Sequence, residues 1–326
     1  MQRSLLWLSF NHLPLSLPEL YEAIAIEKGL SGIDEASLLS SPQDIVDICG
    51  SLIRVSENNK EVALAHLSVK EYLLSSKIQE SPVARGFALK PTDANTELAL
   101  LCLTYLSYTP FKHGPVDLET EWLERVEKHP LMEYGSTSWP YHAVRAGQPD
   151  KLNTAILKFF KAEECKIYIS WVQALNWDSW SAYQRHYNPL YYAASFGLDE
   201  IIPNLIRAAE DIDAPGNRYG GTALHGAVFR EHIRVVELLL EARADPNEPN
   251  CFNHTPLQAA AGQGQLKIIK MLLNYGADVR AQYRGLTPYQ RAIRNGHNEA
   301  AKMILAAERE RYTESSLSYS LKGLND

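Results

Sequence analysis

The second half of this chain repeats one phrase four times, and this repetition restricts the possible folds more than any other feature. The copies read NPLYYAASFG, GTALHGAVFR, HTPLQAAAGQ and LTPYQRAIRN, at Asn188–Gly197, Gly221–Arg230, His254–Gln263 and Leu286–Asn295. Their equivalent residues Asn188, Thr222, Thr255 and Thr287 lie 34, 33 and 32 positions apart. A period of this length predicts stacked helical repeats rather than one globular core.

Each copy carries the local signals of two consecutive helices. A Thr hydroxyl can cap the first helix, and Pro256 and Pro288 then follow where a proline loses no intrahelical hydrogen bond. Second helices are expected because apolar residues recur at three- and four-residue steps after each phrase. They should span Ile233–Ala244, Leu266–Ala277 and Glu299–Glu310. We expect Gly276 to end the second of these in a left-handed conformation.

With this period, the phrases resemble the T-P-L-H-x-A signature of ankyrin repeats over about residues 186–310. His225 matches the histidine of the signature, whereas Gln258 replaces it in the third copy. Glu231 and Arg243 replace usual glycines, so we expect a less regular helix end at Arg243. Tyr289 replaces a usual leucine in the fourth copy, which should be the terminal cap. The resemblance implies a short solenoid in which each repeat packs only on its neighbours.

The ankyrin resemblance implies protein binding through the loop tips and the inner helices. Carried over by position, the predicted protein-binding residues are Arg218, Tyr219, Phe252, Tyr283, Arg284, Phe196, Arg230, Gln263 and Asn295. An aromatic residue recurs at the tips, as Tyr219, Phe252 and Tyr283. Two interpretations stay open. The rings cover their own loops, or they form a strip that faces a partner, since exposed aromatic residues and Arg are enriched at interfaces.

The first 78 residues carry signals for three helices, a hairpin and a further helix. Ser16–Glu19 fits a capping box that opens a helix, and Ser68–Glu71 fits another. Between them, Ser51–Ser56 and Val62–Leu67 are typical of two short strands joined by a polar turn. This order of elements predicts a winged-helix unit.

The phrases LPLSLPELYEAIAI, DIVDICGSLIRVS and HLSVKEYLLS resemble the GPI inositol-deacylase type of winged-helix domain, which follows the NACHT ATPase domain in fungal NLR-like proteins. In that family a helical region and an ankyrin array come next. The resemblance implies that this chain is the ligand-sensing end of such a protein, either as a short gene product or as part of a longer one. The ATPase domain of that family is absent from the sequence, which contains no G-x-x-x-x-G-K-[ST], so we expect no cofactor.

The middle of the chain is expected to be a helical connector. Residues Thr96–Tyr108 and Leu118–His129 have helical apolar periods. Thr137–Gly147 echoes the repeat phrase weakly, as a degenerate repeat or a helical cap. The three tryptophans that follow should fill the junction with the array, the alternative being a ligand groove. They are Trp171, Trp177 and Trp180.

No residue pattern indicates an enzyme or a metal site. The sequence lacks G-x-S-x-G and H-E-x-x-H, and His66 is expected to be structural rather than a general base. The four cysteines fit no metal spacing and indicate a reducing compartment, cytoplasmic or nuclear. No apolar run approaches the ~20 residues that a membrane span needs. A net charge of −7 makes nucleic acid an unlikely partner.

We therefore predict a mostly α chain in four parts. These are a winged-helix domain with a small β-hairpin at 1–78, a helical connector at 79–187, an ankyrin-repeat solenoid at 188–310 and a flexible tail at 311–326. The predicted function is a non-enzymatic protein–protein interaction scaffold at the ligand-sensing end of an NLR-like signalling protein. The alternative is a transcription-associated adaptor with its winged helix on DNA. Asp44 and Asp47 weigh against it, because phosphate contacts need cations.

Overall fold

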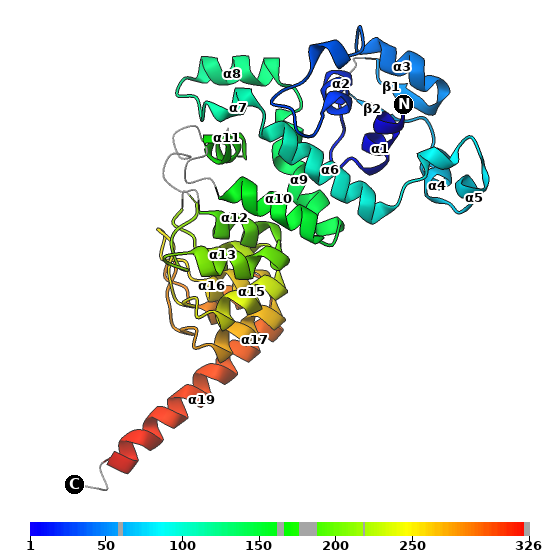
Figure 1. The fold of residues 1–326 in the computed structure, drawn as a ribbon. Coiled ribbons are helices and arrows are strands. Elements are labelled where there is room, and N and C mark those ends of the chain that lie inside the picture. The colour runs from blue at the N-terminus through cyan, green and yellow to red at the C-terminus, as the bar shows by residue number, and fades with distance from the viewer. Residues whose placement is uncertain (58–60, 162–165, 176–187, 218, 323–326) are drawn as a thin grey trace. The chain divides into compact units, whose positions relative to one another are not determined.

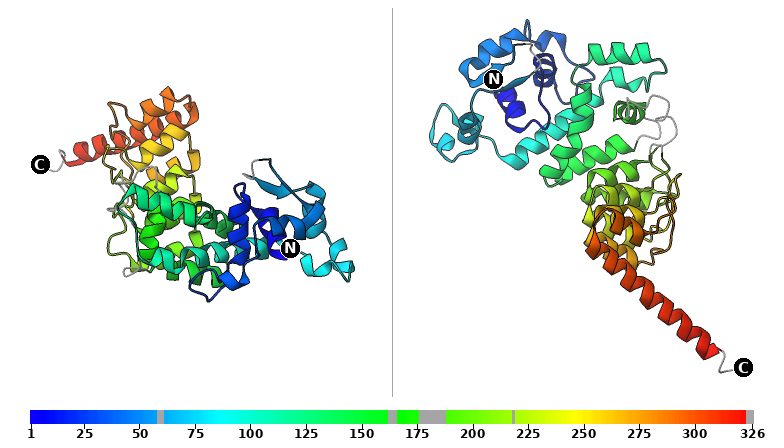
Figure 2. Two further views of the ribbon diagram at one scale, coloured as in Figure 1. Left: turned by 90° about the horizontal axis from the view of Figure 1, so that it is seen from above. Right: turned by 180° about the vertical axis from the view of Figure 1, so that it is seen from behind.

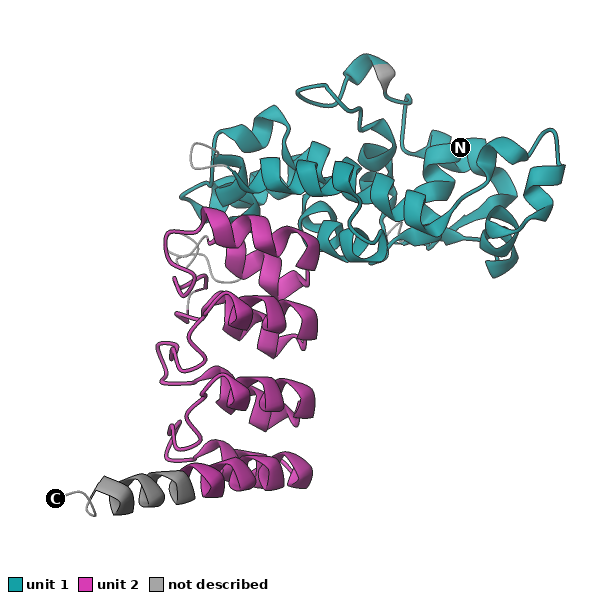
Figure 3. Cartoon of the chain, turned by 60° about the horizontal axis from the view of Figure 1, so that its bottom comes forward, with its two compact units in different colours: residues 1–184 teal, residues 185–326 magenta. Residues whose placement is uncertain are grey.

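The computed structural model describes residues 1–326 except 58–60, 162–165, 176–187, 218 and 323–326 (Figure 1). The chain divides into two compact units, Met1–Gln184 and Arg185–Asp326 (Figure 3). Helices dominate both units, and the described residues contain one two-stranded sheet. The predicted mostly α fold is therefore confirmed. Three residues singled out from the sequence, Arg218, Trp177 and Trp180, lie outside the described part of the chain.

The first unit opens with the predicted order of three helices, a hairpin and a helix. The elements are α1 (Gln2–Phe10), α2 (Leu17–Ala25), α3 (Gln43–Cys49), β1 (Ile53–Val55), β2 (Val62–Leu64) and α4 (Leu67–Leu74). Strand β1 pairs antiparallel with β2, with Ile53 opposite Leu64. The Val62 N–H also donates to the Leu15 carbonyl at 2.7 Å, so the segment before α2 adds a third, single-residue rung to the sheet.

One of the two predicted capping boxes is present and the other is wrong. Ser16 and Glu19 cap α2 reciprocally, with the Ser16 N–H donating to Glu19 Oε2 at 2.7 Å. Helix α4, however, begins at Leu67 and is capped by His66, whose Nδ1 accepts from the Ser68 N–H at 3.1 Å. Ser68 is therefore the second residue of the helix and not its cap, and the imidazole of His66 binds its free N–H. His66 therefore has the structural role expected of it.

The rest of the first unit is a helical bundle with an aromatic core. Its elements are α5 (Lys77–Glu80), α6 (Pro91–Leu106), α7 (Thr109–Lys112), α8 (Glu119–Lys128), α9 (Met132–Arg145), α10 (Asp150–Phe160) and α11 (Lys166–Leu175). Trp139, Phe160 and Trp171 pack with ring centroids 5.6–5.9 Å apart. The Trp171 indole N–H donates to the Ser136 carbonyl at 3.0 Å. Trp171 thus fills the core of this unit.

A buried histidine joins α6 to α9. His142 Nδ1 lies 2.9 Å from Asn95 Oδ1, which can only accept, so this nitrogen carries the proton. The Tyr134 hydroxyl lies 3.1 Å from Nε2 and donates to it. Burial lowers the pKa of His142 to about 3, with smaller contributions from His12 and Arg145. His142 is therefore neutral at neutral pH and fixed in one tautomer.

The weak resemblance of residues Thr137–Gly147 to the repeat phrase holds in the structure only at the end of the phrase. Helix α9 begins at Met132, so Thr137 lies in its interior and caps nothing. The turn after α9 does follow the repeat geometry. Gly147 has a φ of +70°, and the Gln148 N–H donates to the Ala143 carbonyl at 3.2 Å. The first repeat contains the same arrangement, in which the Leu198 N–H donates to the Ala193 carbonyl at 3.0 Å.

The second unit consists of four stacked helix pairs with loops along one edge (Figures 2 and 3). The inner helices are α12 (Pro189–Phe196), α14 (Ala223–Phe229), α16 (Pro256–Gln263) and α18 (Pro288–Arg294). The outer helices are α13 (Ile202–Ala208), α15 (Ile233–Glu241), α17 (Leu266–Asn274) and α19 (Asn298–Lys322). Small residues such as Ala194, Ala227 and Ala260 are fully buried between layers, where the helices approach closely. Helix α19 continues past residue 310, and the proposed boundaries remain predictions.

Glu231 and Arg243, which replace usual glycines, both keep the left-handed geometry of glycine, and Glu231 has a φ of +61°. Arg243 has a φ of +68°, like Gly276 at +88°, and the hydrogen bond that follows is the same. The Ala244 N–H donates to the Leu239 carbonyl at 3.0 Å, and the Ala277 N–H donates to Leu272 at 2.9 Å. The expectation of a less regular helix end at Arg243 is therefore wrong. The hydrogen bond holds this residue left-handed although its side chain disfavours that conformation.

Candidate protein-binding surface

In the second and third repeats, the third residue after the capping threonine links its repeat to the next one. In the second repeat, His225 Nδ1 accepts from the Thr222 N–H at 3.2 Å. Its Nε2–H donates to the His254 carbonyl of the following repeat at 2.8 Å. Burial lowers the pKa of His225, so the ring stays neutral and keeps one donor and one acceptor. A single imidazole therefore caps its own helix and binds its neighbour.

In the last two repeats a glutamine takes the place of the histidine, and each glutamine performs one of these two roles. Gln258 Nε2 donates forward to the Ala281 and Leu286 carbonyls, both at 2.8 Å. Its Oε1 is buried and has no hydrogen-bond partner among the described residues. Gln290 turns back instead, and its Oε1 accepts from the Thr287 N–H at 3.0 Å. One amide thus performs the forward role and the other performs the capping role.

Further side chains bind backward to the preceding inner helix. His232 Nε2 lies 3.1 Å from the Ser195 carbonyl, and Gln265 Nε2 donates to the Val228 carbonyl at 2.9 Å. The predicted contact residue Asn295 donates from Nδ2 to the Gly262 carbonyl at 2.7 Å. These bonds fix the ends of the inner helices, so the surface they carry is held on a rigid frame.

Asparagines shape the loops that precede the second and third repeats, residues 209–222 and 242–255, which we call the second and third fingers. Asn250 Oδ1 accepts from the Phe252 and His254 N–H groups at 3.0 and 3.1 Å, and Asn217 makes the equivalent bonds. The Cys251 N–H donates to the Tyr219 carbonyl at 2.8 Å. The rings of Tyr219 and Phe252 therefore lie together, 5.7 Å apart, and are 42% and 53% exposed.

The fourth finger, residues 275–287, is one residue shorter and has a different tip. Tyr283 and Leu286 exchange both backbone hydrogen bonds at 3.0 Å, with Arg284 and Gly285 at φ +51° and +74° between them. Positive φ at both positions is typical of a type I′ hairpin turn. The Tyr283 ring packs edge-on against His254 at 4.6 Å and is half-buried. Tyr283 thus turns toward the third finger.

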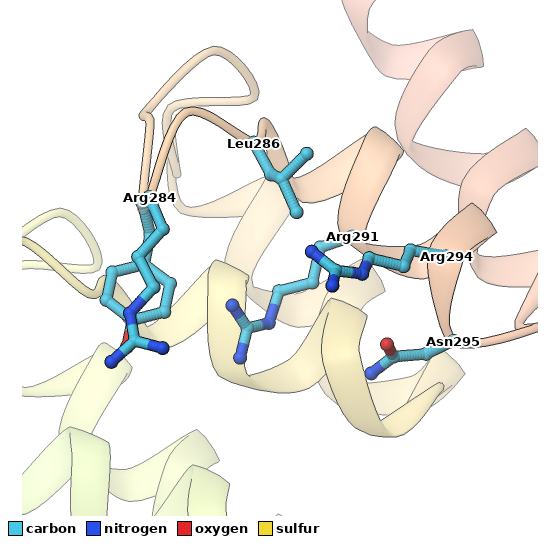
Figure 4. A pocket seen from close by; sticks show the side chains of 6 residues that line it. Arg284, Leu286, Arg291, Arg294 and Asn295 are labelled. Carbon is cyan, nitrogen blue, oxygen red and sulfur yellow. The ribbon is translucent and has the colours of Figure 1, made fainter.

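A cationic hollow of about 300 Å³ lies beside this tip, lined by Tyr283, Arg284, Leu286, Arg291, Arg294 and Asn295. Figure 4 shows Arg284 reaching it from the finger and Arg291 and Arg294 from α18. The guanidinium groups of Arg291 and Arg284 lie 4.9 and 5.3 Å from the centre of the Tyr283 ring. Burial and then Arg291 lower the pKa of His254 to about 4. The hollow therefore presents positive charge on an aromatic wall.

The other predicted inner-helix residues occupy varied surroundings. Phe196 is half-buried and stacks on Tyr192 at 6.4 Å. Arg230 is exposed beside Phe229, which is itself 61% exposed. Gln263 is exposed and accepts from Gln265 Nε2 at 2.5 Å. Their roles in binding remain predictions.

Two arginines and one phenylalanine also shape this surface, although they are not among the residues predicted from the sequence. Arg291 lies four residues after its capping threonine, where the two preceding repeats have Gly226 and Ala259. Arg294 and Phe229 lie seven residues after theirs, where the third repeat has glycine. A comparison of the copies at these small-residue positions reveals all three.

Neither a metal centre nor a membrane span is found within the described ranges. No group of three His, Cys, Asp or Glu residues among them could hold a metal ion. No helix in the same part of the chain is long and apolar enough to cross a membrane.

The fold defines a stacked-repeat protein whose finger tips and inner helices form an exposed face. Residues 142–250 and 243–314 match the family of ankyrin repeats, in three copies, which together cover more than half of the chain. The chain therefore belongs to the ankyrin-repeat proteins. Residues 1–89 match the winged-helix domain described as that of GPI inositol-deacylase. Ankyrin repeats are protein-interaction modules, and this winged-helix domain is not itself catalytic.

Curated relatives share different lengths of the chain. A Monascus ruber protein named azaphilone pigments biosynthesis cluster protein L is 30% identical over 267 residues, covering 74% of this chain and 55% of the relative. The putative ankyrin repeat protein FPV014 of Fowlpox virus is 41% identical over 87 residues, 26% of this chain and 20% of its own. The probable 26S proteasome regulatory subunit p28 of Saccharomyces cerevisiae is 31% identical over 123 residues, which cover 36% of this chain and 54% of the relative. The chain thus spans about half or less of these relatives.

Proposed function

We propose that this chain is the ligand-sensing end of a fungal NLR-like signalling protein, in which the repeat array binds a protein partner. The observation that carries the proposal is the exposed pair of rings, Tyr219 and Phe252, held in place by asparagine-anchored fingers. Exposed aromatic side chains on a rigid frame lose little conformational freedom when a partner covers them. This geometry favours the partner-facing interpretation of these two rings, whereas Tyr283 is half-buried and packs against the third finger.

The combination of domains supports the signalling part of the proposal. A winged helix of the GPI inositol-deacylase type precedes an ankyrin array in this chain. The Monascus ruber relative aligns with 74% of the chain, which is far more than the array contains, so its similarity is not limited to the repeats. We infer a cytoplasmic or nuclear protein whose ATPase domain belongs to the full-length family and whose winged helix relays binding between domains.

The winged helix is better suited to packing than to DNA. Its third helix, α3, carries Asp44 and Asp47 and no Lys or Arg. Asp44 is engaged locally, since its carboxylate accepts from the Ser41 N–H at 3.1 Å and from the Ser41 hydroxyl at 3.0 Å. A helix with this charge would repel phosphates rather than contact them. The relay role therefore has better physical support than the adaptor role on DNA.

Affinity capture with quantitative mass spectrometry tests the binding role. The full chain serves as bait in a fungal extract, next to a Tyr219→Ala/Phe252→Ala variant and a Tyr275→Ala control. Tyr275 is 47% exposed at the end of the outer helix α17, away from the finger tips. We expect one protein to be recovered with the wild type and the control but several-fold less with the double variant, at nearly unchanged melting temperatures. Equal recovery with all three baits would refute the proposal.

A further inference from the structure

The charge of the array is divided between its two halves. Residues 188–250 contain ten Asp and Glu but only five Lys and Arg, whereas residues 251–311 contain four and nine. The first half is thus net acidic and the second half net basic, although the whole chain carries −7. A local positive field in an acidic protein attracts a negatively charged partner to one end of the array.

The arginines of the hollow lack the carboxylate partners that some other cations of the array have. Arg280 pairs with Glu308 at 2.8 Å, and Arg234 pairs with Glu237 at 2.5 Å. Arg284, Arg291 and Arg294 have no carboxylate partner among the residues that the structure describes. The Nε of Arg291 is in addition buried, and no described residue accepts a hydrogen bond from it. An unpaired buried donor and gathered like charges both destabilise a fold, so they call for a role other than stability.

The third repeat makes room for this arrangement. A Cβ atom on Gly262 would lie 2.8 Å from Arg291 Nε, so a side chain at this position would displace the guanidinium from its place against α16. Asn295 reaches the Gly262 carbonyl and stands beside the hollow. The packing of two adjacent inner helices therefore positions Arg291, while the tight turn of the fourth finger positions Arg284.

We propose that this hollow binds an acidic segment of the partner protein, with an Asp or Glu carboxylate held by Arg291 and Arg294 and a second acid near Arg284. The inference rests on the proposed function, because it specifies the chemistry of the partner at the same surface. Planar guanidinium groups donate paired hydrogen bonds that match the two oxygens of a carboxylate. The adjacent rings of Tyr219 and Phe252 would contact apolar residues beside the acids.

The charge pattern favours a short acidic peptide over a nucleic acid. The basic region covers only the last two repeats, and the first two repeats carry a surplus of acidic residues. A duplex presents phosphates along its whole length and needs several cations in a row. An acidic peptide segment can end, or change its composition, where the array becomes acidic.

Fluorescence anisotropy on the full chain tests this inference with fluorescein-labelled hexaglutamate, hexaglutamine and hexalysine peptides. The variant Arg291→Gln/Arg294→Gln is compared with Lys267→Gln/Lys270→Gln, which removes the same charge from exposed positions of α17. We expect hexaglutamate alone to bind, more weakly at higher salt. Its affinity should fall about tenfold or more in the arginine variant and stay nearly constant in the lysine variant. Thermal melting confirms that both variants are folded.

Several results would overturn the inference. Equal binding of hexaglutamate and hexaglutamine would show that the hollow does not recognise acidic side chains. A similar loss of affinity in both variants would indicate a non-specific charge effect. Displacement of hexaglutamate by inorganic phosphate or duplex DNA at matched charge would point to a phosphate site instead. Failure here is distinguishable from failure of the proposed function. A captured partner that requires Tyr219 and Phe252 but tolerates Arg291→Gln/Arg294→Gln overturns only the acidic-segment inference.

Discussion

The buried amide of Gln258 should provide a large part of the coupling between the third and fourth repeats. The residue is fully buried, and its Nε2 donates to two carbonyls of the fourth finger, both at 2.8 Å. The substitution Gln258→Ala removes both donors without changing the charge of the chain. Leu286 keeps a second donor, the Tyr283 N–H at 3.0 Å, whereas the structure gives Ala281 no such replacement.

The expected loss follows from these two bonds. A net contribution of about 1 kcal/mol for each bond, with a further penalty for the unpaired Ala281 carbonyl, gives about 2–3 kcal/mol. Repeat arrays are stabilised by interfaces between neighbours, so the fourth repeat should separate before the rest of the array unfolds. Gln258→His should stay within about 1 kcal/mol of the wild type. Its Nε2–H can reach Leu286 as His225 reaches His254, and its Nδ1 can accept from the Thr255 N–H.

Urea unfolding followed by circular dichroism measures the free energy, and hydrogen exchange read by mass spectrometry locates the loss. Faster exchange is expected in α18 and in α19 up to residue 311, with the first two repeats unaffected. Gln290→Ala is the matched control. That side chain is exposed and only caps its own helix, so its loss should cost about 0.5–1 kcal/mol.

Two results would refute this reasoning. A destabilisation by Gln258→Ala no larger than that by Gln290→Ala would show that the forward bonds do not couple the repeats. A Gln258→His variant as unstable as Gln258→Ala would show that ring and amide are not equivalent donors at this position. The first outcome would assign the coupling of the last repeats to apolar packing alone.

Three further predictions concern other parts of the chain. Because the pKa of His142 is depressed to about 3 in the folded chain, this histidine is protonated at a higher pH in the unfolded chain than in the folded chain. The stability that neutral His142 contributes is therefore complete above about pH 6.5 and is lost as the pH falls toward 3, with a loss on the order of 3 kcal/mol at pH 4. The urea midpoints of the wild type and of His142→Gln should accordingly converge near pH 4. Arg243→Gly and Glu231→Gly should each raise the unfolding free energy by up to about 1 kcal/mol, since both residues hold a positive φ, and a decrease in the urea midpoint would contradict this. The full chain should not retard duplex DNA in a gel at low salt, and a salt-sensitive shift abolished by mutations in α3 would favour the adaptor role.

The fold could be predicted from the sequence because its signals are local and repeated. A threonine followed by proline marks the start of α16 and α18, and spaced apolar residues mark α15 and α17. The predictions are wrong at the cap of α4 and at the turn after α15, where an unexpected type of residue takes the role. A histidine caps α4 in place of the expected serine, and an arginine adopts the left-handed turn expected only of glycine.

The binding surface was harder to predict because it depends on which side chains meet across repeats. Tyr219 and Phe252 could be identified as tip residues, but their contact depends on a hydrogen bond between two fingers. The single-residue shortening of the fourth finger is visible in the spacing of 32, yet its effect on Tyr283 is not. The position of Arg291 in the hollow depends on the glycine that lies opposite it in the preceding repeat.

The ring and amide residues that link the repeats also restrict how such an array can change in length. A repeat with His225 can stand between two neighbours, since it binds its own cap and the next finger. In the fourth repeat Gln290 is bonded back to Thr287, and its Nε2 makes no forward bond among the described residues. Duplication of the second copy would therefore reproduce a junction that this chain already contains, whereas duplication of the last copy would depend on a new acceptor for Gln290 Nε2. Lengthened relatives should accordingly derive their added copies from inside the array.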